Sequence, residues 1–551
     1  MQKNYLRLAG KSIILFAGIM VYAATGKAQS VYLPQSYQFY QKFNADIYSK
    51  SSGMHTSLRP FLIDSTINGR YNQLMQMGVD SSRHSWFLRK IFNEHLIDVK
   101  TKDWTFFADY VQDNTIGHDF SEQGPKEEVH FKPLGFGFST RIGTNTRGFQ
   151  LGGTVGTKFS FYTSGYENQS AFPDYYTAYV KQIGFVPGQA YDRGPNKTYR
   201  DYSYATAILS YTPIQQLNIT LGQDKTFIGD GYRSILLSDY AANYPLLRLT
   251  ANIGKVQYMM MWTYLQDLNL PKFDEFGSNR RKWGLFHYLD WNVTNSLSFG
   301  FFNAYIAPEA DDQGNRRGFD ANLINPLPFA VGSGPSSLPG NSLYGLTGKY
   351  KIFDKHAVYG QLLFDQTKPA VTTTSNVKNS GGVQLGVRGA DIFGVKDLNY
   401  LVEYDAVKPY TYSSPQVISA YSFFSQPLGD PLGANFREVM GLVNYTYKRF
   451  DFQGQLMYAK YGVDATAADN AGRDVTKPLV PTVNGNSIGQ GLNTNLYYAE
   501  GTVAFLLNPK YNLRFELGAL YRMEKNSLGD KKATVLTFGI KSSFRNLYHD
   551  F

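Results

Sequence analysis

Cysteine is absent from all 551 residues of the chain. The fold can therefore use neither a disulfide framework nor a thiolate metal site, and no cysteine is available to carry a lipid. Long apolar runs are also missing: beyond residue 28, no stretch of 18 apolar residues occurs, which argues against hydrophobic membrane-spanning helices. Neither a Pro/Ser-rich linker nor a block of like charge divides the chain from residue 104 onward. We therefore expect one large unit held together by burial and hydrogen bonding.

The first 28 residues have the pattern of a secretory signal peptide. Lys3, Arg7 and Lys11 precede an apolar run over residues 12–24, and Gly26-Lys27-Ala28 supplies small residues at the minus-3 and minus-1 positions of a cleavage site. We expect cleavage before Gln29. Losing this segment would remove four of the positive charges behind the formal net charge of +10, so the mature chain is only mildly basic.

Aromatic residues and glycine are abundant, with 42 Tyr, 39 Phe and 52 Gly. This composition, in an exported chain without cysteine, is typical of a membrane β-barrel, in which lipid-facing side chains alternate with polar lumen-facing ones and aromatics form girdles at both interfaces. We predict an all-β fold, a transmembrane antiparallel barrel of about eighteen strands over residues 104–551, in the outer membrane.

Alternating apolar and polar residues mark the strands, and the connections between them support the barrel. The strands are expected to start near residues 104, 134, 149, 202, 217, 246, 256, 282, 296, 343, 356, 382, 398, 438, 450, 494, 513 and 534, with Phe149 to Phe161 as one clear run. Short connections, such as 143–148, 212–216 and 448–449, lie between long ones, such as 162–201, 306–342 and 406–437. One rim with short periplasmic turns and another with long extracellular loops explains this alternation, and an even strand number returns both termini to the periplasm. Phe551 gives only a partial match to a barrel-closing C-terminal signature.

Residues 29–103 differ from the barrel sequence. Leu88, Ile91, Phe92 and Leu96 recur at intervals of three and four within residues 85–99, which predicts an amphipathic helix. We expect a small, partly helical periplasmic or plug region that packs against the periplasmic end of the barrel, and the alternative is a loose periplasmic tail.

The stretch from Leu217 to Thr250 breaks the alternation. Two strand-like ends enclose about 24 residues that carry Asp224, Lys225, Asp230, Arg233 and Asp239 among glycines and apolar residues. Either a structural loop folded over or into its own barrel, or a ligand-contacting loop, has this composition. We predict a plug motif of Asp230, Arg233, Asp239 and Arg248, in which Arg233 and Asp239 point inward and are satisfied by opposite charges.

The sequence gives little support for catalysis or for a cofactor. The eight histidines show no metal-binding spacing and no G-x-S-x-G occurs, so we expect no enzyme activity, no cofactor and no metal site. Glu309, Asp311, Asp312 and Asn315 have oxygen ligands suited to calcium, but they lack the EF-hand register and are expected to form a solvated loop.

Tyrosine-rich long loops favour sugar binding instead, because aromatic faces stack on pyranose rings while charged groups bond hydroxyls. The candidate ligand residues, each of which could equally belong to the aromatic girdle, are Tyr166, Tyr176, Tyr191, Asp192, Arg193, Tyr410 and Tyr412.

Four segments resemble the Wzi-like capsule-assembly family of outer-membrane proteins. They are GQDKTFIGDGYRSILLSDYAANYPLLRL at 222–249, KWGLFHYLDWNVTNSLSFGFFNA at 282–304, NPLPFAVGSGPSSLPGNSLYGLTGKYKIF at 325–353 and GVQLGVRGADIFGVKDLNYLVEYDAVKPYTYS at 382–413. The stretch 33–61 is similar to the gliding-motility RemB branch. Where the family often has a Trp-Gly pair in the first motif, this chain has Ile228-Gly229. The resemblance implies a barrel of about eighteen strands that holds capsular polysaccharide on the cell without cleaving it.

The expected partners are therefore outer-membrane lipid and lipopolysaccharide, a surface polysaccharide and periplasmic or motility proteins, with no nucleic acid. Two alternatives stay open: a channel or transporter for oligosaccharide or lipid, and a scaffold of a motility or secretion machine.

Overall fold

The computed structural model describes residues 32–551 apart from 63–64, 123, 132–136, 195–196, 268–278, 311–315, 317–319, 328–339, 367–379 and 480–485. Within these residues, eighteen antiparallel strands form a closed ring in which β27 pairs with β3. The strands are β3 (Trp104–Asp119), β6 (Ile142–Val155), β7 (Phe159–Ala171), β10 (Arg200–Ile214), β11 (Leu217–Asp224), β13 (Tyr244–Ile253), β14 (Val256–Asp267), β15 (Arg280–Asn292), β16 (Leu297–Pro308), β17 (Asn341–Phe353), β18 (His356–Gln366), β19 (Gly381–Ala390), β20 (Leu398–Val407), β23 (Phe436–Tyr447), β24 (Phe450–Val463), β25 (Leu492–Asn508), β26 (Leu513–Asn526) and β27 (Gly529–Lys541). The predicted fold class is confirmed.

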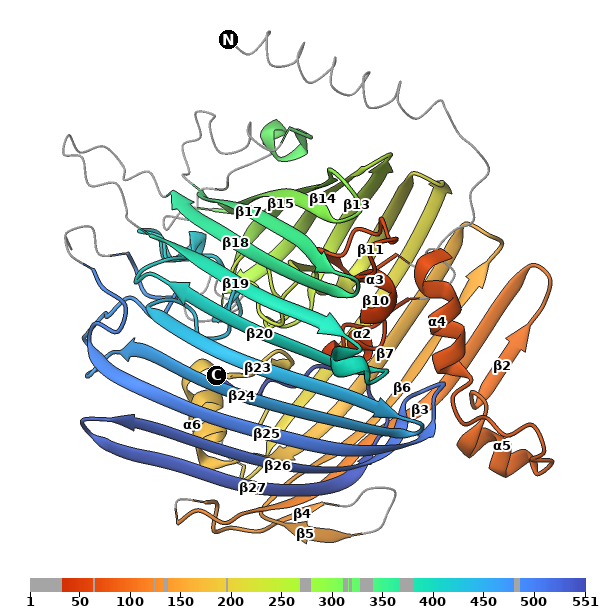
Figure 1. Ribbon diagram of the computed structural model, residues 1–551. Coiled ribbons are helices and arrows are strands. Elements are labelled where there is room, and N and C mark those ends of the chain that lie inside the picture. The colour runs from red at the N-terminus through yellow and green to blue at the C-terminus, as the bar shows by residue number, and fades with distance from the viewer. Residues whose placement is uncertain are drawn as a thin grey trace.

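The two rims of the barrel differ as the spacing predicted. Tight turns such as 254–255, 354–355 and 448–449 lie at one rim, called here the short-turn end, and long connections lie at the other, the long-loop end. The turn at 527–528, between β26 and β27, is the exception at the long-loop end. Figure 1 shows α4, α5 and the turns at the right of the barrel, opposite the long connections.

One predicted hairpin turn lies at a different position in the structure. Residues 143–148 lie inside β6, and the turn comes at 156–158, where Gly156 has a φ of 59°. Val155 pairs with Phe159 across this turn, so both side chains lie on the same face and the alternation continues through it. The predicted run from Phe149 to Phe161 therefore joins two strands. Around the strand expected near residue 134, the described residues form the small hairpin β4 (Val129–Phe131) and β5 (Phe138–Thr140) instead.

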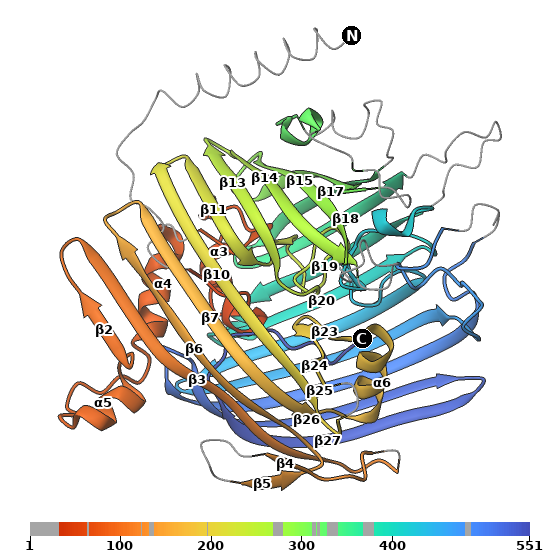
Figure 2. The same ribbon diagram turned by 180° about the vertical axis from the view of Figure 1, so that it is seen from behind.

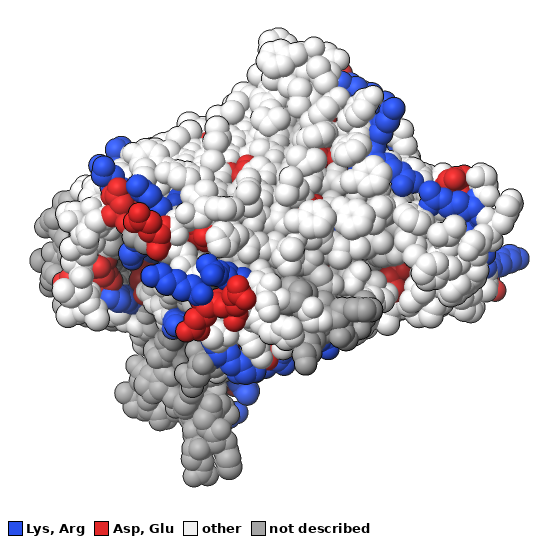
Figure 3. Space-filling model, turned by 90° about the horizontal axis from the view of Figure 1, so that it is seen from below, with Lys and Arg blue, Asp and Glu red and all other residues white. Residues whose placement is uncertain are grey.

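The outer wall carries exposed aromatic residues near both rims, as expected for lipid-water interfaces. Near the short-turn end they include Trp291, Phe299, Tyr350, Phe353, Tyr447, Phe450 and Phe515, and near the long-loop end Trp283, Phe364, Tyr404, Tyr458, Tyr497 and Tyr521. Figure 3 shows the outer face around β27, where Lys and Arg concentrate toward the two ends and uncharged residues predominate between them. Among the described residues, no helix is both long and apolar enough to cross a bilayer.

Short helices and small sheets complete the described structure. The helices are α2 (Tyr37–Gln41), α3 (Asn44–Ile47), α4 (Ser65–Met75), α5 (Trp86–Phe92) and α6 (Asp174–Ile183), with 3-10 turns η2 (Ala321–Ile324), η3 (Ile392–Gly394) and η4 (Val417–Ser419). The Ser36 hydroxyl caps α2 by accepting the Phe39 N–H, and Gly184, with a φ of 76°, ends α6. The remaining strands are β1 (Leu58–Arg59), β2 (Ile97–Lys100), β8 (Phe185–Val186), β9 (Ala190–Tyr191), β12 (Phe227–Ile228), β21 (Ser422–Phe423) and β22 (Gln426–Pro427).

The helix predicted over residues 85–99 is shorter and less buried than expected. Residues 86–92 form α5, residues 97–100 form β2, and the stripe residues Leu88 and Leu96 are exposed. His95 and the backbone of Leu96 are bound by Asp109 of β3, at 2.7 and 2.8 Å. These bonds draw the chain into an extended pairing with β3, which overrides the helical periodicity.

The core of the molecule lies inside the barrel. Buried apolar residues from the N-terminal region, the connection 225–243 and the inner wall form one cluster that includes Tyr37, Leu58, Ile228, Leu236 and Phe436. Figures 1 and 2, seen from opposite sides, both place α6 and the C-terminal residues within the ring of strands. Three segments far apart in sequence therefore meet in the lumen.

Candidate functional site

The connection 225–243 folds into the lumen of its own barrel. Its strand β12 pairs with β1 of the N-terminal region, Leu58 opposite Ile228 and Arg59 opposite Phe227. Ile235, Leu236 and Leu237 are completely buried, and the carbonyls of Ile235 and Leu236 accept hydrogen bonds from Tyr412 and Tyr421, at 2.6 and 2.7 Å. Gly229 has a φ of 130° and lies so close to Gln361 that a Cβ would come within 2.0 Å of its amide nitrogen. The segment is thus a packed plug element rather than a solvated loop.

Arg233 holds the centre of this plug. Its side chain is fully buried and lies 3.0 Å from the carboxylate of Asp550 and 3.4 Å from that of Glu438. Its backbone N–H donates to Glu403 at 2.9 Å. Asp550 belongs to the C-terminal tail, Glu438 to β23 and Glu403 to β20, so one residue ties the plug to the tail and the wall.

Asp230 anchors the plug to the N-terminal region. It accepts hydrogen bonds from Tyr48 at 2.9 Å, from Ser57 at 2.5 Å and from Thr56, and lies 3.8 Å from the ammonium of Lys349. Burial alone would raise the pKa of Asp230, but the Lys349 charge and the three hydroxyl donors together lower this pKa to about 2. The carboxylate is therefore ionised and fully engaged.

Asp239 departs from the expected charge pairing. It is buried as predicted, yet it accepts from two uncharged donors, Tyr548 at 2.5 Å and Asn546 at 2.6 Å. The nearby Lys225 donates to the carbonyls of Gly188 and Asp239, at 2.7 and 2.9 Å, and burial lowers the pKa of Lys225 to about 8. Arg248 of β13 also points inward and donates to Thr226 at 3.0 Å.

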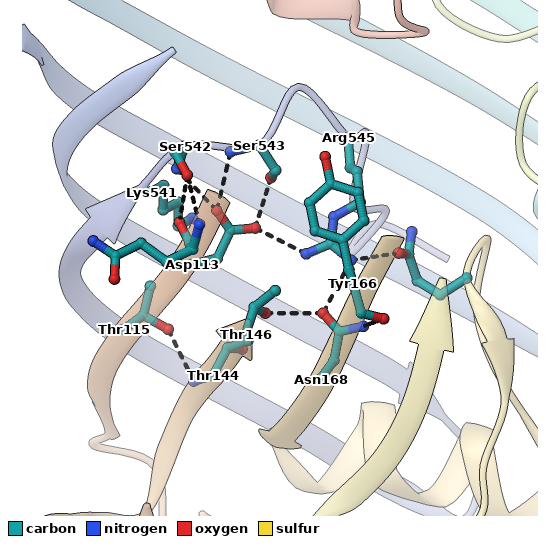
Figure 4. Close-up of polar contacts among 12 residues, drawn as sticks. Asp113, Thr115, Thr144, Thr146, Tyr166, Asn168, Lys541, Ser542, Ser543 and Arg545 are labelled. Atoms are coloured by element: carbon teal, nitrogen blue, oxygen red, sulfur yellow. Dashed lines mark hydrogen bonds and ion pairs between the residues drawn. The ribbon is translucent and has the colours of Figure 1, made fainter. Parts of the chain in front are cut away.

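Residues 542–551 form a third lumen element that the sequence did not suggest. Figure 4 shows Arg545 reaching the wall: it donates to Asp113 at 2.8 Å and to Asn168 at 3.0 Å, and its guanidinium carbon lies 4.2 Å from the ring centre of Tyr166. Ser543 also donates to Asp113, at 2.6 Å. The available signal was the end of strand alternation at Phe544, which left the last seven residues without a place in the wall. We call residues 542–551 the tail.

A large cavity opens at the long-loop end, above this packed interior. Its volume is about 820 Å³, and its lining comes from α6, the connection 408–435, the first part of the connection 464–491, β24, β26 and β27 near the long-loop end, and the tail. Tyr175 and Tyr179 supply partly exposed aromatic surface, whereas Tyr461 and Phe551 line the cavity with almost all of their surface buried. The arrangement combines aromatic surface with many hydrogen-bonding groups in a space open to solvent.

Cations sit on two of these aromatic faces. The guanidinium of Arg473 lies 4.0 Å from the ring centre of Tyr461, and that of Arg522 lies 4.3 Å from the ring centre of Tyr175. Arg522 also pairs with Glu524 at 2.9 Å, and Lys477 pairs with Asp464 at 2.6 Å. The lining includes five basic side chains, Arg473, Lys477, Arg522, Lys531 and Lys532, and four acidic ones, Asp174, Asp464, Asp474 and Glu524. The lysines on β27 are exposed at the rim.

The sequence-predicted ligand residues are dispersed. Tyr191 is 54% exposed, and Arg193 is accessible while it binds Glu167 and Asp201. Asp192 is buried and pairs with Arg200 at 2.9 Å. The other four, Tyr166, Tyr176, Tyr410 and Tyr412, have less than a tenth of their surface exposed, so their rings support the loops and the lumen. Much of the predicted loop 306–342 lies outside the described residues.

The sequence did not single out most of the cavity lining. Tyr175, Tyr179, Tyr461, Arg473 and Arg522 are not among the candidate ligand residues that the sequence predicts. They come from four separate stretches, and Arg522 lies within a strand whose alternation explains its inward direction without indicating a ligand. Among the described residues, no three His, Asp or Glu side chains gather in a way that could hold a metal ion.

No family model matches this chain, and no curated protein does. Solved structures do. Wzi, an outer-membrane protein involved in group 1 capsule assembly in Escherichia coli and described as a carbohydrate-binding β-barrel, is similar over 94% of this chain and 100% of its own, with 14% identity and a TM-score of 0.54. Pseudomonas aeruginosa OprD and OccK5 cover 81% and 80% of this chain and 98% and 97% of their own, each at 8% identity, with TM-scores of 0.41 and 0.39. The likeness to Wzi concerns the fold: this chain has the fold of outer-membrane β-barrels.

Proposed function

We propose that this protein resides in the outer membrane, with its long-loop end extracellular, and binds a surface polysaccharide without cleaving it. The single observation that carries the proposal is the cavity of about 820 Å³ at the long-loop end, which combines aromatic rings with paired cations and carboxylates above a filled lumen. Tyrosine faces stack on the apolar side of a sugar ring, while Arg, Lys and Asp side chains exchange hydrogen bonds with its hydroxyls. The packed lumen supports retention rather than passage. The description of Wzi as carbohydrate-binding adds a parallel.

One such site binds weakly, at about the millimolar end of the affinity scale. A polymer that presents the same unit to many copies of the barrel gains by raised effective concentration, so firm retention does not require a tight single site. Lys531 and Lys532, exposed at the rim of the cavity, favour a polysaccharide with acidic units. A link to gliding motility, and a scaffold in a motility machine, remain predictions of the sequence resemblance.

The test replaces Tyr179 and Arg473 by alanine, singly and together, and measures binding of fluorescently labelled surface polysaccharide, purified from the source cells, to the barrel in detergent. We expect each single change to weaken binding by about tenfold, because one stacking or charge-assisted contact is lost. Tyr191→Ala, an exposed tyrosine outside the cavity lining, is the matched control and should bind like wild type.

In cells, deletion of the gene should release polysaccharide into the medium without reducing the total made. Loss of total synthesis would point to an export role. Unchanged polysaccharide with lost surface movement would contradict the proposal and favour the motility scaffold.

A further inference from the structure

An apolar surface projects from the short-turn end, outside the ring of strands. Figures 1 and 2 both show α5 outside the strands at this end, next to the hairpin of β2 and β3. Trp86 and Phe87, at the start of α5, are 61% and 62% exposed. With their neighbours they form what we call the rim patch: Trp86, Phe87, Leu88, Leu96, Ile97, Val99 and Trp104, all exposed.

The rim patch lies where two neighbouring strands of the barrel wall, β27 and β3, pair over only part of their length. β27 pairs with β3 only from Asp113 to Asp119. On that side, the N-terminal part of β3 therefore does not pair with β27. β2 fills this place by pairing Ile97–Lys100 with Thr105–Ala108 of β3. An uncovered strand edge can pair with another chain, and β2 covers this edge of β3.

The side chains of β2 continue the outer face of the barrel. Residues opposite each other in an antiparallel pair share a face, so Ile97 and Val99 lie on the same side as Ala108 and Phe106. That side also carries Trp104 and Tyr110, which are exposed on the wall, whereas Asp109 on the opposite side is buried toward the lumen and binds His95 and Gln150. Ile97, Val99 and Trp104 of the rim patch therefore continue the apolar belt that faces lipid.

The position of α5 is fixed by the barrel rather than by the patch. Asn508 donates to the carbonyls of Lys90 and Glu94, at 3.1 and 3.0 Å, and Lys90 pairs with Glu94 at 2.9 Å. These contacts secure the C-terminal half of the helix and leave the Trp86, Phe87 and Leu88 end projecting. Three consecutive large apolar side chains held out by a polar anchor imply an apolar environment around them.

Basic groups border the same area. Lys100 lies at the tip of the β2–β3 hairpin, and burial together with this neighbouring ammonium lowers the pKa of Lys510 in the adjacent turn. Lys100 is exposed and pairs with Asp98 at 3.1 Å, and exposed indole rings beside such basic groups match the chemistry of a phospholipid interface, where indole rings sit at headgroup level and ammonium groups meet phosphates.

We propose that the rim patch inserts into the interfacial region of the phospholipid leaflet at the short-turn end and anchors this rim of the barrel to the membrane. A membrane lipid is the occupant, because Ile97, Val99 and Trp104 of the patch continue the lipid-facing belt. The anchor is independent of polysaccharide binding, which takes place at the opposite end.

The absence of cysteine makes a direct test straightforward. Phe87→Cys in the full chain is labelled with a nitroxide, and the barrel is placed in nanodiscs of phosphatidylethanolamine and phosphatidylglycerol. Collision with oxygen, which concentrates in the acyl region, is compared with collision with a water-soluble nickel chelate. Asn72→Cys, an exposed position on α4 in the same region of the chain, is the matched control.

We expect the label at residue 87 to be at least severalfold more accessible to oxygen, relative to nickel, than the label at residue 72. Equal ratios at the two positions would place the patch in water and overturn the proposal. Shielding of residue 87 from both reagents would also overturn it, because it would mean that protein covers the patch. The nanodisc contains no polysaccharide, so this outcome does not depend on the function proposed above.

Discussion

Arg233 shows how a single residue couples the parts of this molecule. Its guanidinium is buried together with the carboxylates of Glu438 and Asp550. The guanidinium carbon lies 5.1 Å from the ring centre of Tyr232 and 5.6 Å from that of Tyr548. The net stability of a buried ion pair depends on desolvation, but removal of one partner is always costly because the other charge stays buried.

Arg233→Ala should therefore lower the free energy of unfolding by about 3–5 kcal/mol. The measurement is thermal or denaturant unfolding of the purified barrel, followed by tyrosine and tryptophan fluorescence. Arg193→Ala is the control, since its ion pairs with Glu167 and Asp201 are exposed and should contribute less than about 1 kcal/mol. Equal stability of the two variants would mean that the centre of the plug is solvated.

Asp230 gives the plug a defined response to acid. Its folded-state pKa, about 2, lies below the ordinary aspartate value of 3.8, so its contribution to stability is complete above pH 4 and is lost as the pH falls toward 2. The contribution is on the order of 2 kcal/mol. Melting temperatures between pH 4 and pH 2 should fall more steeply for the wild type than for Asp230→Asn, which lacks this titration. Parallel slopes would contradict the assignment.

At the scale of elements, the sequence was sufficient for strands and insufficient for what fills the barrel. Alternation locates a strand because successive side chains point to the inner and outer faces, which differ in polarity. Tight turns such as 254–255 and 448–449 interrupt the alternation and so mark where one strand ends and the next begins. The same alternation misplaced the first hairpin, because the turn at 156–158 keeps Val155 and Phe159 on one face.

The lumen elements could not be read in this way. Tyr48 contacts Asp230 and Arg233 contacts Asp550, although the two residues of each pair are far apart in the sequence. Nothing local in either segment specifies its partner. Charge and apolar content did predict that Arg233 and Asp239 would be inward, because a segment with both must be buried or bound. They could not predict that Asp239 would be satisfied by Tyr548 and Asn546 rather than by a cation.

The sequence was least informative about which residues line a ligand site, for a related reason. A tyrosine-rich loop has the same composition whether its rings face solvent or pack inward, and Tyr176 and Tyr412 pack inward while Tyr191 does not. The cavity at the long-loop end is lined by α6, two long connections, three strands and the tail, so only the closed barrel brings its aromatic and basic groups together.

For the whole molecule, the arrangement of cavities determines whether the barrel retains or conducts. The tail borders three of them: Phe544 lines a small one of about 20 Å³ beside α2 and α4, Tyr548 and His549 line a polar one of about 130 Å³, and Phe551 lines the large one of about 820 Å³. These spaces follow β24 to β27 along one side of the lumen, and the tail lies between them.

The intact protein should therefore show no steady pore in a planar lipid bilayer, whereas a variant that ends at Ser543 should conduct ions. Removing residues 544–551 deletes the side chains that separate the three cavities, and the polar wall of Arg514, Glu516 and Lys541 would then line a continuous water path. Heat-modifiable migration on a detergent gel verifies that the shortened barrel has folded before its conductance is measured. A steady large pore in the intact protein would contradict the retention role and favour a channel for oligosaccharide. A silent shortened barrel would show instead that the N-terminal region and the connection 225–243 close the lumen without the tail.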